Sequence, residues 1–238
     1  MEKSLTLPAL ALGLSLSAGL LATGLYLKQT ALALKASERT VTVKGLAEQD
    51  VDANIAIWPI RFTEVDNDLP RLYDTLEQKS AKVLDFLKQQ GFDDSEISLG
   101  LPAIEDRQAQ GYADPNLKYR YTAKVTISLY SSQVARVLET RRQLATLARE
   151  GIAIGGNDYE NRTEFLYTDL NAVKPAMVQL ATENAREVAD KFAHDSGSHL
   201  GKIKSASQGQ FTISDRDSNS PQIKRIRVVS TVTYYLTD

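Results

Sequence analysis

The segment Asp195–His199 contains an aspartate, two serines and a histidine, which are the side chains of a serine hydrolase. A catalytic triad needs these groups to converge from separate elements beside an oxyanion hole. Neighbours at the end of a helix do not converge in this way, and the sequence has no Gly-x-Ser-x-Gly elbow. We therefore predict a polar helix end closed by Gly197 and no catalytic residue.

Two further patterns resemble metal sites without completing one. Asp215–Asn219 begins like a calcium loop, but Ser220 stands where the loop needs glycine and Ile226 where it needs glutamate. A solvated turn is the favoured interpretation, with weak cation binding as the alternative. His194 and His199 are the only histidines, and five residues apart they do not share a helix face as zinc ligands would. We predict no metal and no cofactor.

Composition excludes several other functions. The chain has 28 lysines and arginines against 30 aspartates and glutamates, a formal net charge of −2. Nucleic acid is not expected as a partner, because phosphate binding needs a concentrated basic face. The absence of cysteine excludes disulfides, thiolate zinc sites and cysteine nucleophiles.

Two Asp-Arg pairs are the candidate partner-binding residues. Asp106 and Arg107 lie in a polar loop over 105–116, and Asp215 and Arg216 lie in a second polar loop over 214–221. Each pair follows a helix and a strand pattern and precedes a long strand pattern, which indicates a weak internal repeat. We predict an α+β fold of two pseudo-repeated strand-strand-helix-strand-strand units, with helices packed on antiparallel sheets.

The elements that position these pairs are predicted from apolar spacing and from turn residues. Gly45 is expected to interrupt the first strand, and Trp58-Pro59 to form a bulge or a sheet edge. Asp68 and Pro70 start a helix, and Ser131 or Ser132 caps the next one. The predicted strands are 40–44, 53–62, 97–104, 119–130, 163–167, 202–213 and 223–236, and the predicted helices are 70–90, 132–150 and 175–195.

An apolar stretch, Leu5–Leu27, precedes these elements, and no charged residue occurs between Lys3 and Lys28. As a helix, the uncharged run would extend roughly 36 Å, enough to cross a bilayer core of about 30 Å. An uncut anchor fits this length, and a signal peptide cleaved after Ala31-Leu32-Ala33 is the alternative. The predicted organisation is a membrane anchor or signal sequence over 1–28, a linker over 29–39, which could continue the anchor helix, and one domain over 40–238.

The chain is similar to the SIMPL-domain family over almost all of the part that follows the apolar stretch. The similarity is carried by residues 39–62 (RTVTVKGLAEQDVDANIAIWPIRF), 183–203 (ENAREVADKFAHDSGSHLGKI) and 223–236 (IKRIRVVSTVTYYL). This resemblance implies export to a bacterial envelope, with the domain in the periplasm and the anchor in the inner membrane. Counted alone, the basic residues flanking the apolar stretch favour the opposite orientation. The family resemblance also implies ring-forming oligomers and a link to oxidative or envelope stress, and it transfers no catalytic residue.

Three functional hypotheses result. The first is a non-enzymatic, membrane-tethered envelope protein that assembles into a homo-oligomer. The second is a binding module that uses the loops 105–116 and 214–221 to capture a partner protein or an unidentified small ligand. The third is an enzyme, for instance a hydrolase that uses Ser196–His199.

Overall fold

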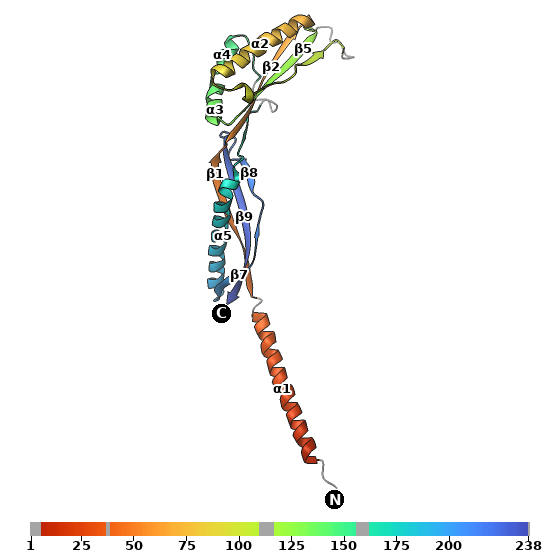
Figure 1. Cartoon of the computed structure of the whole chain (residues 1–238), viewed down its shortest axis with the longest axis vertical. Helices are drawn as coiled ribbons and strands as arrows, with labels where there is room; N and C mark the ends of the chain where they lie inside the picture. Colours follow the sequence, from red (N-terminus) through yellow and green to blue (C-terminus); the bar gives the residue numbers. More distant parts are fainter. Residues whose placement is uncertain (1–5, 37–38, 110–116, 156–161, 238) are drawn as a thin grey trace. The chain divides into compact units, whose positions relative to one another are not determined.

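A computed structural model describes residues 6–36, 39–109, 117–155 and 162–237 (Figure 1). The chain forms two compact units, and each unit is built from segments that are distant in sequence. Both units combine an antiparallel sheet with packed helices, which confirms the predicted α+β class. Unit 1 comprises Met1–Glu48, Lys174–Phe211 and Arg227–Asp238, and unit 2 comprises Gln49–Val173 and Thr212–Ile226.

The sheet of unit 2 is centred on two long antiparallel strands, β2 (Ile55–Asp66) and β5 (Tyr121–Ser131). Their register is continuous from Ala56 opposite Ser131 to Asp66 opposite Tyr121. Alternate side chains of both strands are buried, as expected for a sheet with one face against a core. The strand order is β3-β5-β2-β6, with β4 also paired to β5. The shorter strands are β3 (Ile97–Leu99), β4 (Ala103–Asp106) and β6 (Glu164–Leu166).

Of the two alternatives predicted at Trp58-Pro59, the bulge does not form, whereas the sheet edge agrees with the structure: among the described residues, β2 pairs with no strand on its β6 side between Ile57 and the bridge from Phe62 to Ile154. Trp58 pairs with Leu129 and Pro59 with Ser128 in the continuous register. Ala56, Trp58, Ile60 and Phe62 are the buried residues of β2. The sequence suggests that the buried face changes at this point, because Ile55 and Ile57, on the face opposite Trp58, are also apolar and half-buried. The single predicted strand over 97–104 is likewise wrong, because it divides into β3 and β4.

One helix, α2 (Leu69–Gln89), covers the buried face of this sheet. It begins as predicted: the side chain of Asp68 accepts a hydrogen bond from the Arg71 backbone N–H at 2.9 Å, and Pro70 lies in the first turn. It ends before Gly91, whose φ of 86° places it in the left-handed region that favours glycine. Its buried apolar side chains are Leu72, Leu76, Val83, Phe86 and Leu87.

The helix predicted over 132–150 is interrupted. The structure has α3 (Val134–Arg142) and α4 (Ala145–Arg149) instead. Between them, backbone hydrogen bonds span three residues rather than four, as in the bond from Gln143 N to Thr140 O at 2.9 Å. The helix cap is Gln133 and not a serine, although the Ser131 hydroxyl accepts a hydrogen bond from its N–H at 3.0 Å. A short 3₁₀ turn, η1 (Asp94–Glu96), completes the helical segments of unit 2 that the structure describes.

Unit 1 contains most of a second antiparallel sheet, of order β1-β9-β7, with β8 paired to β9. A long helix, α5 (Leu170–Asp195), packs on it, and Figure 1 shows the helix running alongside these strands. The small core of unit 1 includes Val43, Ala185, Val232 and Tyr234. The strands are β1 (Thr40–Asp52), β7 (His199–Gln208), β8 (Thr212–Asp215) and β9 (Ile223–Thr237).

Gly45 does not interrupt β1, which runs through it without a break. A Cβ atom at this position would lie 1.8 Å from the backbone oxygen of Ala181 and 2.4 Å from the backbone nitrogen of Ala185. The glycine therefore permits close approach between α5 and β1. The face of α5 toward the sheet is a ladder of small side chains at four-residue spacing, headed by one methionine: Met177, Ala181, Ala185, Ala189 and Ala193.

The apolar stretch forms one helix, α1 (Thr6–Ala36). The predicted linker is therefore helical as far as Ala36, and residues 37–38 lie outside the described part. Leu5, with which the predicted anchor begins, also lies outside it, as do the side chains of residues 6–9 and 11. No helix within the described residues combines the length and the apolar character that a membrane crossing needs. The membrane anchor stays a prediction.

The two sheets have corresponding connections. In one, β2 and β5 are neighbours, α2 precedes β3 and β4, and both short strands pair with β5. In the other, β1 and β9 are neighbours, α5 precedes β7 and β8, and both pair with β9. The first Asp-Arg pair starts at the last residue of β4 and the second at the last residue of β8. This arrangement is compatible with the predicted repeat.

Candidate functional site

The first Asp-Arg pair lies at one end of the unit 2 sheet, where the structure forms a polar network. The guanidinium of Arg120 binds the Asp106 carboxylate through Nε to Oδ1 at 3.1 Å and Nη2 to Oδ2 at 2.8 Å. The backbone N–H of Arg120 donates to Asn67 Oδ1 at 2.8 Å, and its carbonyl accepts from the Arg107 N–H at 2.9 Å. Asp106 is thus engaged within the chain, whereas the Arg107 side chain is exposed.

Charge pairing in this network favours the ionised carboxylates. The hydrogen bond from Arg120 holds the pKa of Asp106 below its ordinary value. Next to it, the Arg71 guanidinium, followed by the backbone N–H groups of Asp68 and Asn67, lowers the pKa of Asp66 strongly. The network therefore links the end of β2 to the start of α2 through charge-assisted hydrogen bonds.

We expect Asp66→Asn to remove a pH-dependent part of the stability. A carboxylate whose pKa is lowered by folding stabilises the fold above its unfolded-state pKa of about 4, and this contribution is lost as the pH falls through the folded-state pKa. The wild-type Tm should therefore exceed the variant Tm at pH 7, and the difference should shrink steadily below about pH 4. Asp190→Asn, at an exposed position on α5, is the control. A difference in Tm that does not depend on pH would contradict the lowered pKa of Asp66 in the folded chain.

The second Asp-Arg pair lies beside a hollow of about 310 Å³ in unit 2, which we name the Asp215 hollow. Asp215 Oδ2 is 3.1 Å from Arg162 Nη2, and Asp215 Oδ1 also binds the ammonium of Lys224. The Lys224 side chain is only 9% exposed, whereas that of Asp215 is 33% exposed. The hollow is lined by Arg162, Thr163, Glu164, Phe165, Leu166, Asp215, Pro221 and Lys224.

Arg216 is not part of this hollow. Its Nε binds the carboxylate of Asp217 at 2.9 Å, and the same carboxylate accepts the backbone N–H groups of Asn219 and Ser220. These bonds make the calcium-like segment a closed turn, as the favoured interpretation of the sequence predicted. Among the residues that the structure describes, no group of three or more acidic, histidine or cysteine side chains is arranged to hold a metal.

The two pairs do not form one site. Asp106 lies opposite Tyr121, which lies opposite Asp66 at the end of β2. Arg162, the partner of Asp215, comes two residues before Glu164, which lies opposite Ile57 near the start of β2. In this antiparallel register Arg162 lies at the height of Pro59, and Asp106 lies at the height of Asp66. The two pairs are therefore about seven residues apart along β2, or roughly 23 Å. Binding by the four residues stays a prediction, and residues 110–116 of the first loop lie outside the described part.

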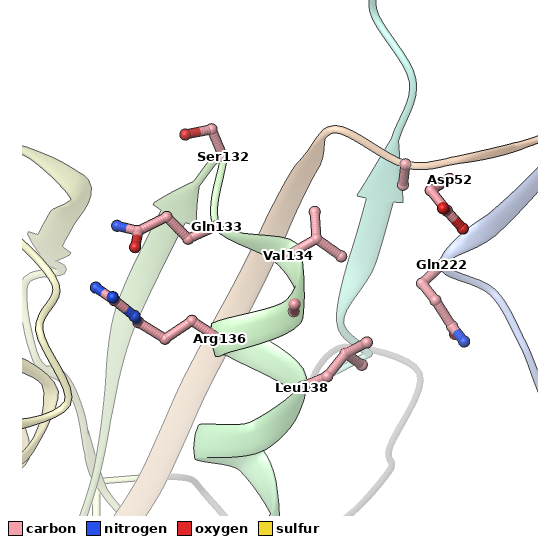
Figure 2. A pocket seen from close by; sticks show the side chains of 9 residues that line it. Asp52, Ser132, Gln133, Val134, Arg136, Leu138 and Gln222 are labelled. Carbon is pink, nitrogen blue, oxygen red and sulfur yellow. The ribbon is translucent and has the colours of Figure 1, made fainter.

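Another hollow in unit 2, of about 590 Å³, lies beside α3 (Figure 2). Val134 and Leu138 point toward the side on which Asp52 and Gln222 lie, whereas Gln133, Ser132 and Arg136 point away from it (Figure 2). Arg136 donates to the carbonyl of Gly91 at 2.8 Å. The polar side chains around this hollow do not converge on one point, so it lacks the feature that fixes a ligand's orientation.

The hydrolase-like segment is the end of α5 and the beginning of β7. The Ser196 hydroxyl donates to the Ala193 carbonyl at 2.9 Å, and the Ser198 hydroxyl accepts from Arg39 Nη2 at 3.0 Å. Gly197 has a φ of 66°, as predicted for the residue that closes the helix. His199 begins β7 and is exposed. The described contacts connect neither serine to a histidine that could act as a general base.

A feature that sequence analysis missed is an apolar ridge at the edge of unit 1. Asn184 Nδ2 on α5 donates to the carbonyl of Leu46 on β1 at 2.8 Å. Leu180, Val188 and Phe192 lie at four-residue spacing on either side of Asn184, and their side chains are exposed. We name Leu180, Val188 and Phe192 the β1-edge ridge. The sequence does not reveal it, because the spacing of Phe192 from Ala185 and Ala189 fits the buried face of α5, whereas its side chain is 57% exposed.

The outer edge of β1, next to this ridge, presents backbone N–H and C=O groups that point away from the sheet. Arg39 O accepts from Leu236 N at 2.8 Å, and Ala53 N donates to Gln222 O at 2.8 Å, so the odd-numbered residues of β1 face β9. The even-numbered residues, which include Leu46, therefore present their N–H and C=O groups on the outer side. At the other edge of the sheet, every residue of β7 from Lys202 to Gln208 is exposed. Such edges are templates for pairing with another strand.

Comparison with known protein families identifies the family of the chain. The family model described as SIMPL, a protein of unknown function, matches residues 41–234. The match begins after α1 and includes both sheets, the β1-edge ridge and the Asp215 hollow. A search of curated proteins found no match.

Proposed function

The chain belongs to the SIMPL family, and from this premise we propose that it is a non-enzymatic, membrane-tethered protein that assembles with further copies of itself through the β1-edge ridge and the open edges of its sheet. The observation that carries the assembly is the presence of exposed apolar side chains beside β1, whose outer edge pairs with no other strand among the described residues. The tether and the assembly are separate parts of the proposal, and each has its own support.

Support for the tether comes from α1. Leucines are exposed around the described length of this helix, among them Leu10, Leu16 and Leu25. Leucines on every side of a helix are typical of a buried environment or a membrane. This distribution of leucines, and not the length of the described part, is the support for the tether, because no described helix is long and apolar enough to cross a membrane. The hydroxyls of Ser15 and Thr23 donate to carbonyls within the helix at 3.0 and 2.8 Å, which satisfies their polar groups without water.

Support for the assembly comes from the geometry of unit 1. The ridge offers apolar area that a second copy can bury, and about 25 cal/mol is gained for each Å² of apolar surface removed from water. The two open edges, β1 and β7, are different surfaces of one sheet, so pairing β7 of one copy with β1 of the next is a heterologous contact. Contacts of this kind form closed rings where the rotation between copies closes. Ring formation is also what the family resemblance implies.

The proposed location is the bacterial inner membrane with the domain in the periplasm, and release into the periplasm after signal cleavage is the alternative. Both locations, and a role in oxidative or envelope stress, rest on the family resemblance alone. The binding-module hypothesis has a specific observation in its favour, which is the Asp215 hollow with its buried Lys224.

The assembly is tested with Phe192→Asp in the full-length chain. A charge within an apolar contact must be desolvated without a partner, so we expect the dissociation constant of the assembly to rise at least about tenfold. The mass of the detergent-solubilised protein is measured by light scattering over a concentration series. Leu101→Asp is the matched control, because Leu101 is 95% exposed, lies in unit 2 and is not part of the ridge.

The proposed surface predicts that only the Phe192 variant dissociates, with a circular dichroism spectrum like that of the wild type. If both variants assemble as the wild type does, or if only Leu101→Asp dissociates, the β1-edge ridge is not the contact.

A further inference from the structure

The Asp215 hollow contains more hydrogen-bond donors than the chain uses. A lysine ammonium has three donors, and the described contacts of Lys224 use one of them, toward Asp215. An arginine guanidinium has five, and those of Arg162 use one, also toward Asp215. Because buried polar groups are normally satisfied, unused donors at a buried ammonium indicate a missing acceptor.

A second, independent observation concerns Thr163. This residue lines the same hollow and is only 4% exposed. Its hydroxyl is fully buried and has no hydrogen-bond partner within the described part of the chain. A buried hydroxyl without a partner destabilises the fold, so the position is explained if a ligand supplies an acceptor.

The charges of the hollow select the ligand. Arg162 and Lys224 carry two positive charges, and Asp215 and Glu164 carry two negative charges, so the formal charges of the lining sum to zero. Water screens Arg162 and Glu164, which are both exposed, whereas the Lys224 ammonium is buried beside Asp215. A monoanion supplies acceptors to the unused donors of Lys224 and adds one negative charge to this neutral set, whereas a dianion such as phosphate adds two.

The remaining lining is apolar. Phe165, Leu166 and Pro221 border the hollow, whose volume of about 310 Å³ is at the lower end of the range for small-molecule sites. We propose that the Asp215 hollow binds a small organic monocarboxylate, with the carboxylate accepting from Lys224, Arg162 and the Thr163 hydroxyl and a short apolar chain lying against Phe165 and Pro221. This proposal is independent of the assembly through the β1-edge ridge, which lies in unit 1.

Butyrate is the probe, and the full-length chain in detergent is the protein. Tm is measured during titration with sodium butyrate at constant ionic strength, with n-butylamine hydrochloride and inorganic phosphate as parallel titrants. We expect a saturable rise in Tm with butyrate, no saturable rise with butylamine, and weaker binding of phosphate than of butyrate. Arg162→Gln should weaken butyrate binding at least tenfold, because it removes a charge-assisted pair with the ligand. Arg216→Gln, whose side chain binds Asp217 outside the hollow, should bind butyrate as the wild type does.

Four results would each overturn the proposal. They are the absence of a saturable rise with butyrate, an equal rise with butylamine, tighter binding of phosphate than of butyrate, and unchanged butyrate affinity in Arg162→Gln. Arg162 is largely exposed and its replacement is expected to leave the fold intact. The emission of Trp58, buried in the core of unit 2, verifies this for each variant.

Discussion

Gly45→Ala should abolish the packing of unit 1 while unit 2 stays folded. The added Cβ would lie 1.8 Å from the Ala181 oxygen and 2.4 Å from the Ala185 nitrogen, both of which are backbone atoms of α5. Neither atom can move without displacing the helix from β1. The core of unit 1 is small, so separation of α5 from the sheet exposes most of it. We expect a loss of more than about 3 kcal/mol, the upper range for overpacking a core.

The two units can be followed separately in this experiment. Trp58 is the only tryptophan and lies in the core of unit 2, so its fluorescence follows that unit. Tyr234 lies in the core of unit 1 and contributes to the near-ultraviolet circular dichroism. Gly24→Ala, where an added Cβ meets nothing within 4 Å, is the control. An unchanged near-ultraviolet spectrum and an unchanged melting profile in Gly45→Ala would show that α5 does not approach β1 as closely as described.

Asp215→Ala should destabilise unit 2 considerably more than Lys224→Met does. Removing the carboxylate leaves a buried ammonium unpaired, and breaking a fully buried ion pair in this way costs about 3–5 kcal/mol. Because Asp215 is one-third exposed, we expect about 2–3 kcal/mol. Lys224→Met removes the buried charge and keeps an unbranched chain, and Asp215 retains Arg162, so its effect should be within about 1 kcal/mol.

Denaturant unfolding followed by Trp58 fluorescence measures both effects. Asp215→Ala/Lys224→Met is the internal control, because removing both charges should recover most of the stability that the single aspartate variant loses. Equal destabilisation by the two single variants would contradict the claim that an uncompensated ammonium causes the loss.

Much of unit 2 could be predicted from sequence because its signals are local. The capping side chain of Asp68, Pro70 in the first turn and Gly91 after the last turn define α2 almost to the residue. In β5, apolar and polar residues alternate, and the apolar positions, among them Ala123 and Leu129, are the buried ones. Such patterns depend on neighbours within a few residues, and tertiary packing did not override them.

The errors in β1 and β2 arose where tertiary contacts decide. Gly45 has the local signature of an interruption, but its role is set by α5, more than 130 residues later in the sequence. Ile55 and Ile57 are apolar on the face opposite Trp58 and so obscured the alternation of β2. The break between α3 and α4 has no proline or glycine to signal it.

The candidate site was predicted only in part. The Asp-Arg pairs were identified by their position in the repeat, and both aspartates are engaged in ion pairs. Their partners, Arg120 and Lys224, come later in the chain and could not be assigned without the strand registers. Nothing in the sequence indicates that Lys224 is buried, because a lysine on a strand is expected to face water. The β1-edge ridge was missed because Phe192 fits the periodicity of the buried face.

The central claim is that copies of this chain assemble through unit 1, and the mass of the intact wild-type protein in detergent tests it most directly. Light scattering with the detergent contribution subtracted should give a protein mass several times the 26.2 kDa of one chain at micromolar concentration. A protein mass of one chain across that concentration range would contradict the account.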